Sequence, residues 1–182
     1  MTHHERGPMT GMFRNRDMAE RAYDCLTRRG YTANDVSLLM SDETRARCFP
    51  RDATTTTELG TKASEGAGVG VVAGAGLGAL LAGLAAAGIA VPGLPIIAMG
   101  PLAAALAGGG TGGAVGAVVG ALIGAGIPES RAKLYDQGIR EGGIVLGVSP
   151  RTEDDAAYFE REWTNARGEQ IYRPTLRSRD AA

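Results

Sequence analysis

The chain of 182 residues has few cysteines, few aromatic residues and no excess of charge of either sign. Its two cysteines, Cys25 and Cys48, are too few for a disulfide scaffold, and the N-terminus lacks the basic-then-apolar order of a signal peptide. A reducing cytoplasmic setting is therefore expected. Lys and Arg number 19 against 20 Asp and Glu, which excludes the strong basic excess typical of a nucleic-acid-binding protein.

The sequence also lacks a combination of side chains that identifies a reaction. His3 and His4 are adjacent, so they point apart on any regular element, and no carboxylate or cysteine cluster accompanies them at a metal-binding spacing. The glycine run at 108–113 has neither the preceding strand nor the later acidic residue that a dinucleotide site requires. We therefore expect a protein that is not an enzyme and that holds no metal or cofactor.

Glycine, by contrast, is abundant, with 28 residues. Between Glu65 and Glu129 there is no charged residue, and glycine recurs within this segment at a spacing of four in two separate runs. On a helix of 3.6 residues per turn, this spacing places the glycines in a stripe along one face, where a second helix can approach closely. The predicted helix-packing residues are Gly66, Gly70, Gly74, Gly78, Gly108, Gly112, Gly116, Gly120 and Gly124.

Proline and glycine cluster at 91–95 and 100–101, and these residues interrupt helices. The charge-free segment is therefore predicted to be a helical hairpin with arms at Gly66–Ala90 and Pro101–Gly126. The first arm would extend about 37 Å, enough to cross a hydrocarbon layer of about 30 Å. The six-residue run at 108–113 is rich in glycine and predicts a break or kink in the second arm.

The environment of this hairpin has two alternatives. Its charge-free length and its small-residue stripes favour insertion into a membrane, whereas its Gly and Ala content contributes little transfer free energy. A soluble assembly, in which several hairpins pack through their glycine stripes, is the other interpretation. In the membrane case, Lys62, Arg131 and Lys133 beside the arms place both flanks in the cytoplasm.

The charged flanks alternate between strand and helix patterns on both sides of the hairpin. Neither flank alone buries enough surface for a stable core, so both are expected to fold together. The predicted fold is α+β, a ferredoxin-like split βαβ sandwich with an inserted glycine-rich α-helical hairpin. The predicted strands are Met9–Phe13, Val36–Met40, Gly143–Val148 and Gln170–Tyr172, and the predicted helices are Asn15–Arg29, Glu129–Glu141 and Glu153–Ala166.

These patterns divide the chain into five parts. They are a disordered N-terminus at 1–8, the first half of the α+β domain at 9–62, the glycine-zipper hairpin at 63–128, the second half of the domain at 129–173, and a tail at 174–182. Within the first half, the polar stretch Ser41–Ala63 is predicted to be a mobile connection.

Several short motifs resemble a bacterial family of general-stress proteins with a YflT-type heat-induced domain, which is similar to the low-temperature-induced proteins of cyanobacteria. The more specific motifs are Gly126-Ile127-Pro128-Glu129 and Gly30-Tyr31. The others are Asp35–Leu39, Gly60–Lys62, Pro92-Gly93, Gly100-Pro101 and Gly142–Ile144. The resemblance implies a stress-induced protein without known catalysis, and it names no substrate.

The predicted function is that of a stress-induced, non-enzymatic, membrane-associated protein that oligomerises through its hairpin. A small oligomeric channel or permeability factor and a soluble oligomeric assembly or ligand-sensing module are the alternatives. The expected partners are further copies of the chain and the lipid bilayer, at the bacterial inner membrane with both flanks cytoplasmic, or else in the cytoplasm. Cys48 is a possible redox residue, because Arg45, Arg47 and Arg51 surround it in the sequence and can favour the thiolate.

Overall fold

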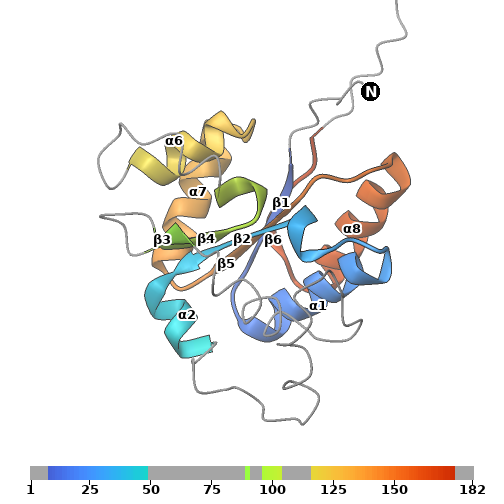
Figure 1. The fold of residues 1–182 in the computed structure, drawn as a ribbon, viewed down its shortest axis with the longest axis horizontal. Coiled ribbons are helices and arrows are strands. Elements are labelled where there is room, and N and C mark those ends of the chain that lie inside the picture. The colour runs from blue at the N-terminus through green and yellow to red at the C-terminus, as the bar shows by residue number, and fades with distance from the viewer. Residues whose placement is uncertain (1–7, 49–88, 91–95, 104–115, 175–182) are drawn as a thin grey trace, which may run out of the picture.

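The computed structural model describes residues 8–48, 89–90, 96–103 and 116–174. They form a six-stranded sheet between two groups of helices, with all neighbouring strands antiparallel and the strand order β3-β4-β2-β5-β1-β6 (Figure 1). The strands are β1 Met9–Phe13, β2 Val36–Ser41, β3 Ile89–Ala90, β4 Ile96–Met99, β5 Ile144–Val148 and β6 Glu169–Tyr172. The helices are α1 Arg16–Arg28, the short η1 Ala33–Asp35, α2 Asp42–Cys48, α6 Gly116–Gly124, α7 Glu129–Arg140 and α8 Glu153–Asn165. The predicted α+β class is confirmed.

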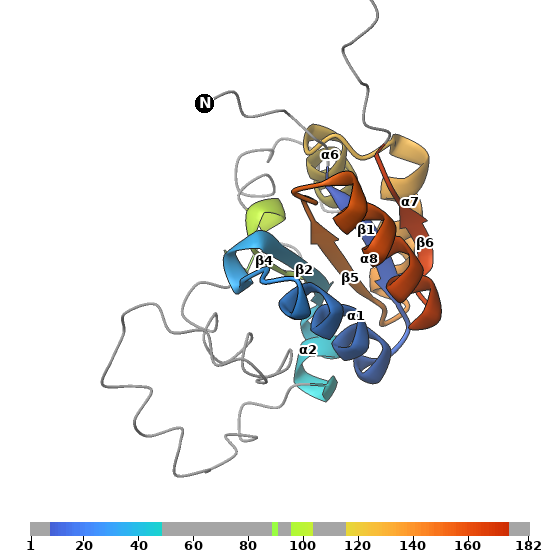
Figure 2. The same ribbon diagram turned by 90° about the vertical axis from the view of Figure 1, so that its right-hand side faces the viewer.

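The first face of the sheet is covered by α1 and α8, which lie side by side (Figure 2). Each helix begins at a side-chain cap: Asn15 accepts from the backbone N–H of Met18, and Thr152 accepts from that of Asp155. Their apolar sides enter a core that includes Phe13, Leu26, Leu38, Leu146 and Trp163. The helical spacing of apolar residues in the sequence therefore predicts both helices correctly.

The second face is covered by α7, and α6 packs against α7 (Figure 1). Tyr135 and Ile139 of α7 are fully buried over Met12, Leu39 and Val145. Alternate residues of β1, β2 and β5 thus point into different cores, and every residue of β1 and β5 is buried. The described elements therefore form three layers, because α7 occupies the face opposite α1 and α8.

The two flanks of the charge-free segment contribute strands to the same sheet. In the unit β1-α1-β2, the two strands are not neighbours, because β5 lies between them and pairs with both. In the unit β5-α8-β6, β1 lies between the two strands in the same way. Residues as distant in the sequence as Phe13 and Ile144 are therefore paired neighbours. Each flank thus completes the sheet of the other.

Two predictions for the charge-free segment are wrong in the described residues. Ile89–Ala90, predicted to end the first helical arm, forms β3, and Ile96–Met99, predicted to lie at the hairpin tip, forms β4. β4 pairs with β2 over Leu38 to Ser41, so this part of the tip belongs to the sheet. The physical reason is that isoleucine favours extended backbone, and the edge of β2 offers unpaired hydrogen-bonding groups.

The second predicted arm is helical over most of its described length, at 101–103 and in α6. α6 covers Gly116–Gly124, and Gly126 ends it with φ +87° while the N–H of Ile127 bonds to the carbonyl oxygen of Leu122 at 2.9 Å. The polar stretch predicted to be a mobile connection also begins with regular structure, since Asp42–Cys48 forms α2. Ser41 caps that helix, because its hydroxyl oxygen accepts a hydrogen bond of 3.1 Å from the N–H of Thr44. The sequence pattern does not predict this helix, because the whole stretch is polar.

Candidate functional site

Three glycines lie on one side of α6. Gly116, Gly120 and Gly124 are exposed on this side, and a Cβ atom added at any of them would meet no heavy atom within 4 Å of the described structure. We call these three residues the glycine face. The other six predicted packing residues, Gly66, Gly70, Gly74, Gly78, Gly108 and Gly112, lie outside the described residues.

The opposite side of α6 is held by the domain. Val118, Ala121 and Leu122 are buried in the core beneath α7, while Ile123 beside the glycine face is 43% exposed. The glycine face is therefore presented on a helix whose apolar side already has a protein neighbour. Within the described ranges, no helix combines the length and the apolar composition needed to cross a membrane.

Cys48 lies at the end of α2 and is partly buried against the core of the first sheet face. Its backbone carbonyl accepts a hydrogen bond of 2.9 Å from the guanidinium of Arg16. Arg45 faces Asp42, at 3.6 Å from Nε to Oδ1, and Arg47 lies against Gly142. Arg51 lies outside the described residues. The thiol thus packs as a small hydrophobic group, and a redox role stays a prediction.

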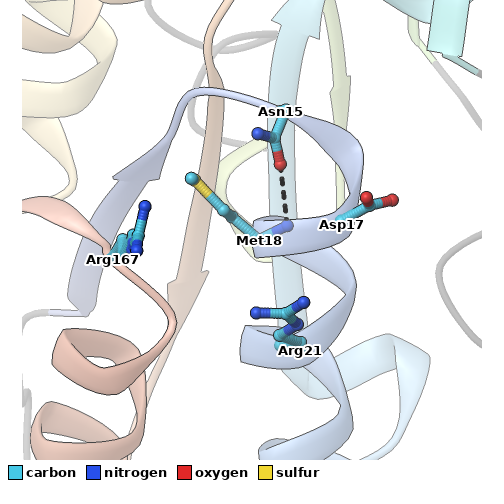
Figure 3. Close-up of a pocket in the computed structure, with 5 residues that line it drawn as sticks. All are labelled: Asn15, Asp17, Met18, Arg21 and Arg167. Atoms are coloured by element: carbon cyan, nitrogen blue, oxygen red, sulfur yellow. Dashed lines mark hydrogen bonds between the residues drawn. The ribbon is translucent and has the colours of Figure 1, made fainter.

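A second candidate is a hollow of about 290 Å³, partly open to solvent, between the start of α1 and the turn that follows α8 (Figure 3). The residues that line it are Asn15, Asp17, Met18, Arg21 and Arg167. Neither the Arg21 nor the Arg167 side chain forms a hydrogen bond or an ion pair within the part of the chain that the structure describes. The hollow therefore has two guanidinium groups available for an external ligand.

The remaining polar groups of the hollow have defined orientations. Asn15 uses its Oδ1 atom to accept from the N–H of Met18 at 3.0 Å, which leaves its amide nitrogen as a donor. Figure 3 shows this nitrogen on the side that faces Arg167 and shows the Asp17 carboxylate directed away from Arg167. The region between Asn15 and Arg167 thus presents hydrogen-bond donors.

Another polar cluster surrounds the buried side chain of Tyr31, a residue in the loop between α1 and η1. The Tyr31 hydroxyl donates to Asp155 Oδ2 at 2.9 Å and accepts from the backbone N–H of Arg151 at 2.6 Å. The Arg151 guanidinium lies over the ring, 4.2 Å from its centroid. Burial raises the pKa of Tyr31 to about 12, so the phenol stays protonated at neutral pH. This cluster joins the two halves of the domain and needs no ligand to complete it.

Comparisons with known proteins returned no matching family model, no matching curated protein and no matching solved structure. Among the described residues, no group of three His, Cys, Asp or Glu side chains is placed to hold a metal ion. Two features remain as candidate sites: the glycine face and the arginine-lined hollow. Sequence spacing identified the first, whereas no motif joins Arg21 to Arg167.

Proposed function

We propose that this protein is a non-enzymatic module that self-associates by packing the glycine face of α6 against the same face of a second copy. The observation that carries the proposal is the exposure of Gly116, Gly120 and Gly124 on one side of a helix. Without side chains on this side, the partner backbone can approach closely enough for extensive van der Waals contact. A two-fold axis brings the face against itself without leaving a free copy of the interface.

The support of α6 by α7 favours a protein partner. Val118 and Leu122 are nearly fully buried in the core, so they anchor the helix while the glycine face points outward. A helix anchored in this way loses little further freedom on association, which lowers the entropic cost of binding. Val118 and Leu122 are also not available to lipid while α6 lies on α7. These contacts support an oligomeric assembly over the channel alternative.

The proposed fold is ferredoxin-like with an insertion. Its support is the central strand order β6-β1-β5-β2, with both crossover helices, α1 and α8, on one face of the sheet. The inserted segment lies between β2 and α7, and β3, β4 and α6 are among its described elements. A glycine-zipper hairpin remains a proposal for the parts of the 63–128 insertion other than β3 and β4, which belong to the sheet.

Membrane association remains a proposal with support from composition. The absence of charge between Glu65 and Glu129 is compatible with a bilayer partner at the inner membrane, with both flanks cytoplasmic. From the resemblance to general-stress proteins, we further propose that stress induces synthesis of this protein. In this proposal, α6, near the C-terminal end of the charge-free segment, packs on α7 and presents the glycine face outward.

The decisive test compares Gly120→Leu with Ala157→Leu by sedimentation velocity of the full chain, in buffer and in mild detergent. Ala157 is exposed on α8, so the control places the same leucine side chain on a helix away from the glycine face. We expect the wild type and Ala157→Leu to form the same oligomer and Gly120→Leu to weaken it about tenfold or more, because leucine separates the helices.

Two outcomes contradict this proposal. Equal sedimentation of all three proteins as the same oligomer would show that another surface makes the assembly. A monomeric wild type, with Gly120→Leu lowering only the thermal midpoint, would show that the glycine face is covered by a segment of its own chain.

A further inference from the structure

We propose that the hollow between α1 and the α8–β6 turn binds a phosphate group, held by Arg21 and Arg167. The two residues come from different halves of the chain, and only the fold brings them to one hollow (Figure 3). This proposal does not depend on self-association, because the hollow lies on the first sheet face whereas α6 lies beyond the second.

The side chains of Arg21 and Arg167 have no partner within the described ranges, whereas other arginines of the domain form ion pairs. Arg14 bonds to both Glu141 and Glu169, at 2.9 and 2.8 Å, and Arg29 pairs with Asp155 at 3.4 Å. Asp17 precedes Arg21 by one helical turn, yet these two described residues form no ion pair. The hollow therefore keeps its positive charge, which an external anion can neutralise.

The backbone of Arg167 adds an independent observation. Arg167 follows the end of α8 with φ +59°, in the left-handed region where glycine is the usual residue. Its N–H bonds to the carbonyl oxygen of Thr164 at 2.9 Å, and that of Gly168 bonds to Trp163 at 2.7 Å, so the turn holds this conformation. A charged side chain at such a position costs about 1 kcal/mol relative to glycine, and here it supplies one side of the hollow.

Phosphate is the anion whose chemistry suits these donors. A guanidinium presents parallel N–H groups that match two phosphate oxygens, and two arginines together balance a doubly negative group. The amide nitrogen of Asn15 supplies a neutral donor for a further oxygen. Because the hollow is partly open to solvent, it suits the terminal phosphate of a larger molecule, either a soluble phosphate monoester or a lipid headgroup.

Substitution of Asp17 should change the phosphate affinity in the opposite direction to substitution of the two arginines. Its carboxylate lines the hollow and repels an incoming phosphate, although it is directed away from Arg167. Asp17→Asn removes this repulsion and is expected to tighten phosphate binding severalfold. Arg21→Gln and Arg167→Gln are each expected to weaken it about tenfold, because each removes a charge-assisted pair.

The experiment titrates the full chain with inorganic phosphate at constant ionic strength and follows backbone amide resonances. We expect saturable shifts at Asn15, Met18, Arg167 and Gly168, with a dissociation constant on the order of 1 mM, and no such shifts with chloride. Arg28→Gln is the matched control, since Arg28 is exposed in the last turn of the same helix and outside the hollow. Thermal midpoints establish that all variants fold, as expected for substitutions at exposed side chains.

A second arm distinguishes the two sources of phosphate. Vesicles of phosphatidylcholine with phosphatidic acid are sedimented with wild type, Arg21→Gln, Arg167→Gln and Arg28→Gln. Retention of wild type and Arg28→Gln together with loss of the other two assigns the lipid headgroup, whereas saturable binding of inorganic phosphate without vesicle retention assigns a soluble ligand. The proposal is overturned if neither arm shows binding, or if Arg21→Gln and Arg167→Gln behave like Arg28→Gln in both.

Discussion

The indole nitrogen of Trp163 donates a hydrogen bond of 3.1 Å to the backbone carbonyl oxygen of Ala22, across 141 positions of sequence. This bond joins α8 to α1, and the whole charge-free segment lies between the two residues in the sequence. The Sγ atom of Cys25 donates to the same carbonyl at 3.0 Å. The indole also lies against Gly11 of β1, where an added Cβ atom would come within 2.9 Å of the ring, so a side chain there would displace Trp163.

Trp163→Phe is expected to destabilise the domain by roughly 2–4 kcal/mol. Phenylalanine cannot donate to Ala22, and its smaller ring leaves a cavity over Gly11. The free energy of unfolding, measured by urea denaturation, checks this expectation. Tyr158→Phe is the control: Tyr158 is only partly buried beside the core, so its substitution should change stability by less than about 1 kcal/mol. Equal losses in the two variants would show that the indole has no special role.

Gly100→Ala tests whether β4 belongs to the sheet. Gly100 has φ +78°, and an added Cβ would overlap the backbone carbonyl oxygen of Val36 in β2. Gly30 has a similar φ of +73° but has no heavy atom within 4 Å of its Cβ position, so Gly30→Ala reproduces the backbone strain without the clash.

We expect Gly100→Ala to lower the free energy of unfolding by about 1–3 kcal/mol more than Gly30→Ala does. Leu102 should respond as well, because its N–H donates to Ser37 Oγ at 3.0 Å and its side chain is buried. Hydrogen exchange at Leu102 would accelerate in Gly100→Ala alone. Unchanged exchange there would mean that β4 does not depend on close contact with β2.

Alkaline pH should destabilise the domain through Tyr135. Burial raises the pKa of Tyr135 from 10.0 to about 12, although a hydrogen bond with Thr10 lowers it. The folded state therefore favours the neutral phenol. Its contribution to stability is fully present below pH 10, and it is lost as the pH rises from about 10 to about 12, by an amount on the order of 2 kcal/mol.

Phenolate absorbance near 295 nm and urea denaturation at several pH values check this prediction. Tyr135→Phe should be less stable at pH 7, because it loses the hydrogen bonds to Thr10 and to the carbonyl oxygen of Gln170. It should nevertheless lose less stability than the wild type between pH 10 and 12. Equal losses over this interval would assign the alkaline transition to other groups, such as Tyr31, whose pKa is also raised to about 12.

Local patterns in the sequence predict most elements of the charged flanks. The strand predicted at Met9–Phe13 is β1, and the helix predicted at Glu153–Ala166 is α8 to within one residue. Asn15 and Thr152 mark the helix starts, and Gly30, with φ +73°, marks the end of α1. These features are predictable because capping, amphipathic spacing and left-handed glycine depend on residues within a few positions of each other.

The same reasoning fails where the neighbour that decides the conformation is distant. Ile96–Met99 is extended because β2 offers it an edge, and the apolar residues around it fit a helical hairpin equally well. For α7, the sequence pattern correctly predicts a helix but does not predict which face of the sheet it covers. Contacts with the distant residues Met12, Leu39 and Val145 decide that.

Residues close together in the chain thus suffice to predict the main strands and helices of the two flanks, although not η1 and α2. They also define the charge-free segment between the flanks and the four-residue glycine period of α6. Long-range packing was needed to place β4 in the sheet, to leave the glycine face open and to bring Arg21 and Arg167 to one hollow. The two groups of features differ in the sequence separation of the residues that determine them. Helix caps and periodicity arise from neighbouring residues, whereas strand pairing, exposure and the meeting of two charges depend on which distant surfaces the chain buries against each other.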